Sequence, residues 1–343
     1  MGDGHVVDLK AFSEVQLAAF FKTLKEPAFR AKQFLLRVYT KKAVSIDDIT
    51  EFSLPLREHL KGISFISSLQ TVKRLESTDG TRKYLFALTD GQTVESVLIE
   101  DDERLTLCVS SQVGCAMGCR FCLTATGGFK RNLKAHEICD QILSVSRDIE
   151  PERKITNIVL MGMGEPLSNY EEVTHALKIM TGWLNISKRR ITLSTAGLVP
   201  ELERLYSDGF RVNPAISLNA TTDDLRSIIM PVNRKYNLKT LLSACRRLPI
   251  PERRRITFEY VLLKGVNDSP DDAVRLVKLL KGIRAKVNLI PFNEFDGANY
   301  KRPSDAAVLE FQEIVAQGHI SVFIRKSKGR DILAACGQLK AGY

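Results

Sequence analysis

Three cysteines on one short segment are the residues of this 343-residue chain best suited to chemistry. Cys115, Cys119 and Cys122 are separated by three and two residues and follow an apolar run at 105–109. Thiolates bind soft metal centres. A structural zinc site or a closed iron–sulfur cluster needs four ligands, and no second CxxC pair or His cluster lies nearby. Three thiolates favour a cluster whose open iron binds a substrate or cofactor; the alternatives are buried thiols or half of a zinc site.

Other residues of interest lie apart from this segment. Cys336 precedes Gly-Gln and follows four cations within eleven residues, Arg325, Lys326, Lys328 and Arg330. Those cations would favour a reactive thiolate and attract anions, although a buried cysteine is the commoner case. Cys108 and Glu95 lie in expected strands, where a core thiol and a solvent-facing carboxylate are ordinary. We assign Cys139 and Cys245, which fall in helical patterns, to structure.

The composition predicts a globular protein with a polyanionic partner. The chain is 44% hydrophobic and 26% charged, with a net charge of +10. No apolar run approaches the roughly 20 residues that span a bilayer, and the N-terminus lacks a signal-peptide pattern. Seven cysteines in such a chain favour metal binding or catalysis over disulfides. We therefore expect a cytoplasmic protein with no membrane partner.

Residues 1–62 predict a small helical accessory domain. Helical periodicity covers residues 12–24, 28–39 and 47–60, with a capping box at Ser13 and Gln16 and a break at Pro27. The domain is basic, and the cations are Lys22, Lys25, Arg30, Lys32, Arg37, Lys41 and Lys42. A solvated helix face explains them as well as RNA binding does, until the rest of the chain is considered.

Residues 63–104 change to strand periodicity. Three apolar runs, at 69–75, 82–88 and 93–99, are separated by Asp-Gly turn signals at 79–80 and 90–91. They predict a short antiparallel β linker element that joins the accessory domain to the remainder.

From residue 105 to residue 320, strands and helices alternate, which predicts an α/β fold with parallel strands. The expected strands are 105–111, 156–162, 191–196, 214–219, 256–263 and 287–292, and the expected helices are 134–147, 170–180, 199–207, 238–247, 269–280 and 304–317. Polar or flexible residues follow every strand, and in barrel enzymes that end holds the active site. We expect a partial (β/α)6 barrel, with a final strand and tail at 321–343.

Several motifs in this order resemble the RlmN/Cfr family of radical S-adenosylmethionine (SAM) adenosine methyltransferases over nearly the whole chain. They are LCVSSQVGC at 107–115, the cysteine loop, MGMGEP at 161–166, SLN at 217–219, PFN at 291–293 and AACGQL at 334–339. Val113, the Gly-Glu-Pro motif and the PFN motif are similar to the branch that methylates C2 of adenine. Methylation at C8, the activity of the other branch, remains the alternative.

The resemblance implies a radical SAM barrel and C2 methylation of an adenosine in 23S ribosomal RNA at the peptidyl-transferase centre. In some members it also implies an adenosine next to the tRNA anticodon. Cys115, Cys119 and Cys122 would bind one [4Fe–4S] cluster, whose open iron chelates SAM. The SAM-binding residues would be Gly164, Glu165, Ser194, Ser217, Leu218, Asn219 and Asn293. Without the resemblance, each polar residue at a strand end is equally a loop or helix cap.

The resemblance also implies catalytic roles for three residues. Cys336 would carry a methyl group from a first SAM, and a radical derived from a second SAM would activate it. A covalent protein–RNA intermediate would follow, from which Glu95 removes the C2 proton. Cys108 would then attack Cys336 and form a disulfide. A low-potential electron donor is a further expected partner, and we expect a monomer.

Two other classes of protein remain open at this point. One is a non-catalytic iron–sulfur or zinc protein that binds RNA, with Cys108 as the fourth ligand of a closed site. The other is a radical SAM enzyme with different chemistry, which would have no need of the cysteine in the tail. Further basic clusters lie at 130–131, 188–190, 246–247 and 253–255, and a groove for folded RNA would explain several of them.

Overall fold

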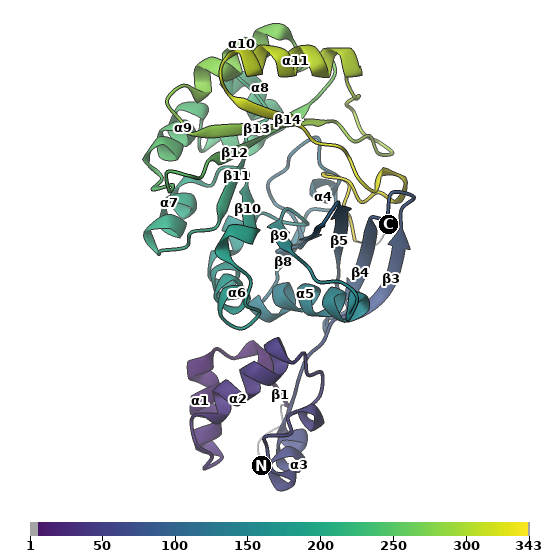
Figure 1. Cartoon of the computed structure of the whole chain (residues 1–343), viewed down its shortest axis with the longest axis vertical. Helices are drawn as coiled ribbons and strands as arrows, with labels where there is room; N and C mark the ends of the chain where they lie inside the picture. Colours follow the sequence, from purple (N-terminus) through teal and green to yellow (C-terminus); the bar gives the residue numbers. More distant parts are fainter. Residues whose placement is uncertain (1–5, 342–343) are drawn as a thin grey trace.

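The structure is a computed structural model, and it describes residues 6–341. A small N-terminal domain hangs below a larger α/β body (Figure 1). Its elements are β1 (Val7–Asp8), α1 (Glu14–Thr23), α2 (Arg30–Leu35), α3 (Leu54–Ile63) and β2 (Ser64–Phe65), and β1 pairs with β2 in parallel. The predicted capping box is present, with Ser13 accepting from the backbone N–H of Gln16 at 3.3 Å.

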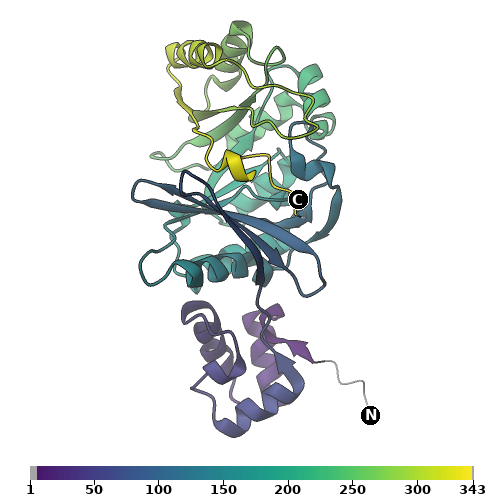
Figure 2. The same cartoon turned by 90° about the vertical axis from the view of Figure 1, so that its right-hand side faces the viewer.

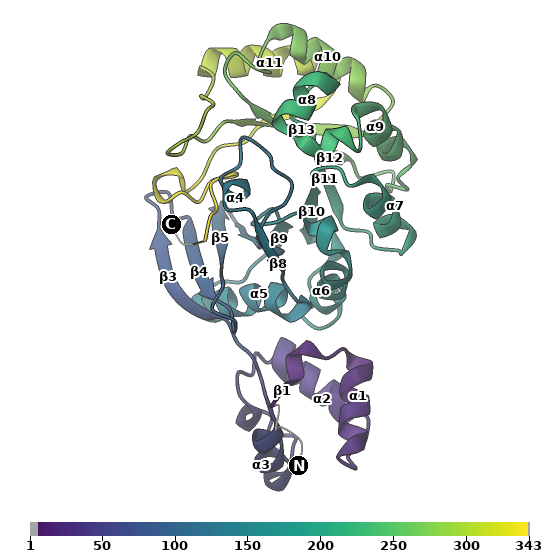
Figure 3. The same ribbon diagram turned by 180° about the vertical axis from the view of Figure 1, so that it is seen from behind.

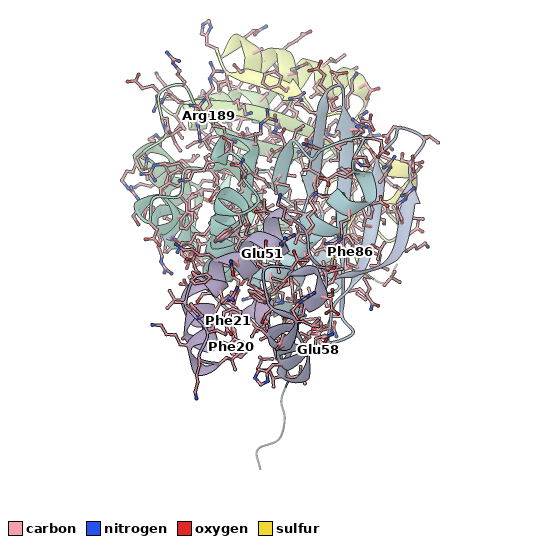
Figure 4. The ribbon with its side chains drawn as sticks, turned by 60° about the horizontal axis from the view of Figure 1, so that its bottom comes forward. Phe20, Phe21, Glu51, Glu58, Phe86 and Arg189 are labelled. Atoms are coloured by element: carbon pink, nitrogen blue, oxygen red, sulfur yellow. The ribbon has the colours of Figure 1, made fainter. Side chains whose placement is uncertain are left out.

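The N-terminal domain is held to the body by polar contacts, those of Lys10 buried and that of Thr40 exposed. Lys10 is 5% exposed, donates to Ser67 O at 2.8 Å and forms an ion pair with Asp140 of α5 (Ala135–Ile149). Thr40 donates its hydroxyl hydrogen to the backbone oxygen of Trp183, at the end of α6 (Tyr170–Gly182), at 2.8 Å. A buried lysine needs such partners, because an unpaired buried charge is strongly unfavourable. In Figure 4 the domain, with Phe20, Phe21 and Glu58, comes forward below the body.

One ten-stranded sheet forms the frame of the body. Its order is β14-β13-β12-β11-β10-β9-β6-β5-β4-β3. The strands are β3 (Gln70–Glu76), β4 (Arg82–Ala87), β5 (Thr93–Asp101), β6 (Arg104–Cys108), β9 (Asn157–Leu160), β10 (Ile191–Thr195), β11 (Asn213–Ser217), β12 (Ile256–Leu262), β13 (Ala285–Pro291) and β14 (Ser321–Ile324). The seven strands from β6 to β14 are parallel, and β3 to β6 are antiparallel.

Helices cover the outer face of this curved sheet (Figure 3). Besides α5 and α6 they are α7 (Val199–Ser207), α9 (Leu238–Arg247), α10 (Pro270–Leu280) and α11 (Asp305–Gln317), whereas α8 (Asp223–Ile229) lies at the carboxyl ends of the strands. The core lies between the two layers, and Ile216, Phe258 and Leu289 on adjacent strands are fully buried in it. The α/β class, the parallel strands and the N-terminal helical region are as the sequence predicts.

The structure also adds elements that the periodicity did not indicate. β14, expected outside the barrel, pairs in parallel with residues 286–289 of β13 and becomes a seventh parallel strand. The antiparallel strands β3–β5 continue the same sheet through the pairing of β5 with β6. A short hairpin of β7 (Gln112–Gly114) and β8 (Phe129–Asn132) flanks α4 (Leu123–Thr126), inside the arc of the sheet. No helix among residues 6–341 is long and apolar enough to cross a membrane.

A buried arginine on α8 joins the carboxyl ends of two strands. Arg226 is 0% exposed, and its guanidinium donates to Ala196 O at 2.8 Å, Ser217 O at 3.1 Å and Leu218 O at 3.0 Å. It also donates to Asn233 Oδ1 at 3.0 Å. Burial lowers the pKa of Arg226 to about 10, so the side chain stays charged at neutral pH. These bonds satisfy carbonyl groups that have no strand partner beyond the sheet.

We expect Arg226→Leu to lower the free energy of unfolding by about 3 kcal/mol, because several buried carbonyls lose their donor. Urea unfolding followed by circular dichroism measures this loss. Arg104→Leu is the matched control: Arg104 is exposed and paired only with Asp101 on its own turn, so its loss costs less than about 1 kcal/mol. Equal losses in the two variants would contradict a clamping role for Arg226.

Candidate active site

The carboxyl ends of the parallel strands surround a pocket of about 1000 Å³, measured out to the surrounding solvent. Ten of the thirteen residues that the sequence marks as catalytic or binding line it: Cys115, Cys119, Cys122, Gly164, Glu165, Ser194, Ser217, Asn219, Asn293 and Cys336. They come from loops that follow different strands, so the parallel arrangement brings them together. Cys108, Leu218 and Glu95 lie outside this pocket.

The cysteine loop is shaped by close backbone packing. Gly114, just before it, has φ +75°, and a Cβ there would lie 1.8 Å from Gly128 O. The backbone N–H of Cys115 donates to the same oxygen at 2.9 Å, and Cys122 is the N-cap of α4. Burial raises the pKa of Cys115 to about 12 and that of Cys119 well above its usual value. Ionising such thiols requires nearby positive charge, which an iron–sulfur cluster provides.

No group of His, Cys, Asp and Glu side chains within residues 6–341 is tight enough to hold a single metal ion. A four-iron cluster is bulkier than one ion, and its thiolate ligands stand apart around it. Three sulfur donors on one loop, facing a shared pocket, fit such a cluster with one iron left open. The donor set therefore suits the predicted cluster better than a mononuclear zinc site.

Glu165 ties together two of the loops around the pocket. Its Oε2 accepts from Ala196 N at 2.6 Å and its Oε1 from Leu167 N at 3.0 Å. The carboxyl is 3% exposed, and burial raises its pKa to about 7. Gly164 has φ +102°, and a Cβ there would lie 2.5 Å from Gln112 Cβ. Glycine at this position allows the turn to pack against Gln112 while the carboxyl borders the pocket.

The other predicted SAM-binding residues differ in how free their side chains are. Ser194 and Ser217 line the pocket, and their hydroxyls have no hydrogen-bond partner among residues 6–341. Asn219 is 1% exposed, and its Oδ1 accepts from Val261 N at 2.8 Å, so this amide fixes β11 against β12. Leu218 is 0% exposed and packs in the core, and its backbone N–H donates to Glu259 O at 3.0 Å.

Two buried oxygen atoms in the pocket have no hydrogen-bond partner within the described residues, and they are Glu259 Oε2 and Asn293 Oδ1. Buried polar atoms are normally paired, so both are available to a bound cofactor. Glu259 was not among the residues selected from the sequence. The sequence feature that could have indicated Glu259 is a carboxylate in the middle of a largely apolar strand, β12. Burial raises the pKa of Glu259.

The tail places Cys336 at the junction of two pockets. Leu123 N donates to Gly337 O at 2.7 Å, and Asn293 Nδ2 donates to Cys336 O at 3.2 Å. A second pocket, which adjoins the first at Cys336, is lined by Cys108 and by the tail cations Arg325, Lys326 and Lys328. Cys336, Asn293 and Arg325 border both pockets. The thiol can therefore be approached from the cysteine-loop side and from the side of the cations.

Arg325 lines the second pocket together with the two cysteines that the sequence singled out. The thiol of Cys336, followed by Glu259 and Cys108, raises the pKa of the Arg325 guanidinium. Burial raises the pKa of Cys108 to about 12, and Arg325 opposes that shift. Cys108 thus lies close to Cys336. A fourth ligand of the cluster would instead lie beside the three loop cysteines. All seven cysteines are free thiols, and no disulfide joins any residues that the structure describes.

Glu95 binds the C-terminal tail to β5. It is 2% exposed on β5, its Oε1 pairs with Lys83 Nζ at 3.1 Å, and its Oε2 accepts from Lys340 N at 2.8 Å. Lys83 also donates to Leu333 O at 3.3 Å. Glu95 borders neither of the two pockets, so in this conformation the carboxylate anchors residues 333–340. Figure 2 shows the yellow tail lying over the dark-blue strands of this region.

The fold and the site define a class of protein. The family model described as the radical SAM superfamily matches residues 109–277. A solved radical SAM methyltransferase from Sphaerobacter thermophilus superposes with a TM-score of 0.92 at 42% identity, over 98% of this chain and 99% of that chain. The body is a radical SAM fold, and the class is that of radical SAM methyltransferases.

A narrower assignment follows from the N-terminal domain and from relatives. The family model for the ribosomal RNA large subunit methyltransferase N-terminal domain matches residues 7–66. The dual-specificity RNA methyltransferase RlmN of Syntrophobacter fumaroxidans is 49% identical over 98% of this chain and 99% of its own length. The RlmN of Geobacter sulfurreducens is 51% identical over 98% of this chain and 92% of its own length. The chain belongs to the RlmN family of radical SAM RNA methyltransferases, which confirms the predicted resemblance and implies a [4Fe–4S] cluster and SAM.

Because the carboxyl of Glu165 is buried, we expect the free energy of unfolding to depend on pH. The folded pKa of this carboxyl, about 7, lies above its ordinary value of 4.5. The folded state therefore holds a proton that the unfolded state has lost, and this contribution to stability falls as the pH rises from about 5 to 8. We expect Glu165→Gln to gain stability relative to the wild type over that range, by up to about 3 kcal/mol. Urea unfolding without added SAM measures the difference.

Glu171→Gln is the matched control for this experiment. Glu171 lies on α6, is exposed and pairs with Arg204, so this variant shows the effect on stability of removing a carboxylate that is not buried. A Glu165→Gln difference that is constant between pH 5 and 8, or that reverses in sign, would contradict a carboxyl protonated by burial.

Arg325 also gives a prediction about Cys336. A nearby guanidinium stabilises the thiolate, which is the nucleophilic form. We expect Arg325→Gln to slow iodoacetamide alkylation of Cys336, because the sulfur loses the cation with which it interacts; peptide mass spectrometry measures the rate. Arg325→Lys keeps the charge and should retain most of the rate, with the exposed arginine variant Arg104→Gln as the control. Unchanged alkylation in Arg325→Gln would show that Arg325 does not act on this thiol.

Proposed function

We propose that the protein methylates C2 of an adenosine in 23S ribosomal RNA, and that Cys336 carries the methyl group. The observation that supports this most directly is the position of Cys336 at the junction of two pockets, one bordered by the cysteine loop and the other by Lys326 and Lys328. A group on its sulfur can face a cofactor on one side and an anionic substrate on the other.

The chain supplies the holding sites for both cofactors. Cys115, Cys119 and Cys122 would hold the cluster, which with SAM supplies the carbon-radical chemistry when bound. Glu165 lies next to the loop and complements the SAM ammonium. The hydroxyls of Ser194 and Ser217 and the unpaired Asn293 Oδ1 would bind other polar groups of SAM.

Radical chemistry is needed because C2 of adenine, flanked by two ring nitrogens, is electron-poor and does not attack a methyl sulfonium. In the proposed sequence the Cys336 thiolate first takes a methyl group from one SAM by displacement. After a hydrogen atom has been removed from this S-methyl group, its carbon bonds to C2 and links the protein to the RNA. A second SAM is consumed for each methyl group transferred.

Release of the product would use Glu95 and Cys108. Glu95 would remove the C2 proton, and the unpaired electron of the adduct would pass to an electron acceptor, for which the cluster held by the three loop cysteines is suited. Cys108 would then attack the Cys336 sulfur, the released carbon would take up a proton to become the methyl group, and the two cysteines would be left as a transient disulfide. Cys108 lines the same pocket as Cys336, as this step needs. Glu95 is bound to Lys83 and to the backbone of Lys340, so acting as a base requires the tail to move off β5.

Further parts of the proposal concern partners. The relatives are named dual-specificity RNA methyltransferases, and we infer tRNA as a second substrate, at an adenosine next to the anticodon. A low-potential electron donor would reduce the cluster. We further propose a monomer that acts in the cytoplasm, where both RNAs occur.

An anaerobic reaction with reconstituted cluster, reductant, SAM and unmodified 23S ribosomal RNA tests this proposal. Nucleosides from the digested RNA are compared by mass spectrometry with 2-methyladenosine and 8-methyladenosine standards. We expect 2-methyladenosine from the wild type and from Cys245→Ala, a change at a buried helical cysteine, and a loss of at least a hundredfold in Cys336→Ala. 8-Methyladenosine would overturn the C2 assignment, and methylation by Cys336→Ala would overturn the carrier.

A further inference from the structure

Basic clusters that are far apart in the sequence meet on one edge of the sheet. We define the basic rim as the loops that lead into β10, β11, β12 and β13, residues 183–190, 208–212, 248–255 and 281–284. Because the strands are parallel, these loops share the amino edge of the sheet, opposite the pocket. Two of the predicted basic clusters, at 188–190 and 253–255, lie within the rim, and a third, at 246–247, ends α9 beside it.

Hydrogen bonds show that the four loops are in contact with one another. Arg254 donates to Arg211 O at 2.6 Å, and Asn213, at the start of β11, donates to Arg189 O at 2.8 Å. Arg284 donates to Ile250 O at 2.5 Å. The rim is therefore one continuous surface and not a set of separate loops.

The charge of the protein is concentrated on this surface. The four rim loops contain nine Lys and Arg against two Asp and Glu, a surplus of seven, whereas the whole chain has a net charge of +10. The loops at the carboxyl ends of β9–β13, residues 161–169, 196–198, 218–222, 263–269 and 292–304, contain three cations against four carboxylates. The loops at the carboxyl ends of β9–β13 are thus nearly neutral, whereas the rim is strongly basic.

The rim cations are not neutralised by the protein itself. No Lys or Arg of the four loops forms an ion pair with any carboxylate among residues 6–341. The guanidinium groups of Arg190, Arg254 and Arg284 donate to backbone carbonyls. These three arginines therefore have a structural role in holding the loops together. Lys188, Arg189 and Arg253 are exposed and make no side-chain hydrogen bond to the described residues, so folding alone does not account for them.

The rim continues from the N-terminal domain. The first rim loop begins at Trp183, whose backbone oxygen accepts from Thr40 of that domain. Figure 4, which turns the domain toward the viewer, also shows Arg189 on the body above it. An RNA held by the N-terminal domain therefore meets the rim on the same side of the molecule.

We propose that the basic rim binds phosphates of folded RNA at a distance from the adenosine that is methylated. This proposal rests on the RNA methyltransferase function proposed above and adds an anchoring surface to it. Phosphate contacts provide affinity without sequence information, and folded RNA is recognised largely by shape and backbone. The rim would thus select large folded RNA over short fragments that contain the same target adenosine.

The test is the triple variant Lys188→Gln, Arg189→Gln and Arg253→Gln in the full chain. Binding is measured by fluorescence anisotropy at several salt concentrations, with a folded 23S ribosomal RNA domain and with a short stem-loop that carries the same adenosine. For the folded domain we expect affinity to fall roughly tenfold or more near 150 mM salt and the log–log salt slope to fall by about two to three. For the stem-loop we expect no change in affinity.

The matched control removes the same charge elsewhere, by Arg74→Gln, Arg104→Gln and Arg153→Gln at ion-paired sites near the antiparallel strands. Lys188→Arg, Arg189→Lys and Arg253→Lys should retain wild-type binding. Wild-type affinity of the triple variant for the folded domain, or equal losses in the control, would overturn the rim as an anchor. Failure of the wild type to methylate RNA would instead overturn the proposed function, since the binding measurement does not depend on turnover.

Discussion

The pocket depends on the way the sheet ends. Strand-end carbonyls of a parallel sheet have no ladder partner, and here the buried guanidinium of Arg226 binds those of Ala196, Ser217 and Leu218 at once. A neutral side chain could not supply donors in so many directions. The clamp fixes the relative height of the β10 and β11 ends, and Glu165 then ties the loop after β9 to Ala196. The spacing of the loops that face the cofactor pocket follows from these two buried groups.

The C-terminal tail, which carries Cys336, also has to be positioned against the sheet. The turn between β3 and β4 binds one part of it: Gly329 N donates to Asp79 Oδ2 at 2.9 Å, and Ser77 Oγ donates to Asp331 Oδ1 at 2.5 Å. α4 binds another part, with Thr124 donating to Leu339 O at 2.6 Å. Each of these contacts is a single hydrogen bond, and a single hydrogen bond adds only about 1 kcal/mol of net stability. A carrier cysteine on such a segment is held in place and can still be displaced when a substrate competes for its partners.

Much of this architecture could be predicted from the sequence, because it depends on local patterns. Alternating strand and helix periodicities give the parallel sheet, and the polar residues after each strand give the pocket edge. Other features could not be predicted in this way. Arg226 lies on a seven-residue helix where an arginine usually faces solvent, and β14 is a four-residue strand whose pairing is decided by β13. The side chain of Leu218 packs in the core, since strand alternation turns it away from its neighbours Ser217 and Asn219, and its contact with SAM stays a prediction.

The division of charge between the two edges of the sheet is consistent with the two ligands that the enzyme handles. SAM carries a sulfonium, an ammonium and a carboxylate, so it is a cation, whereas RNA is a polyanion. A strongly basic pocket would attract RNA but repel SAM, and an acidic pocket would do the reverse. The loops around the pocket are nearly neutral, and at the second pocket positive charge comes from Arg325, Lys326 and Lys328. Most of the remaining surplus lies on the opposite edge, where it attracts phosphate without opposing the cofactor, because charges more than about 10 Å apart are largely screened at physiological salt.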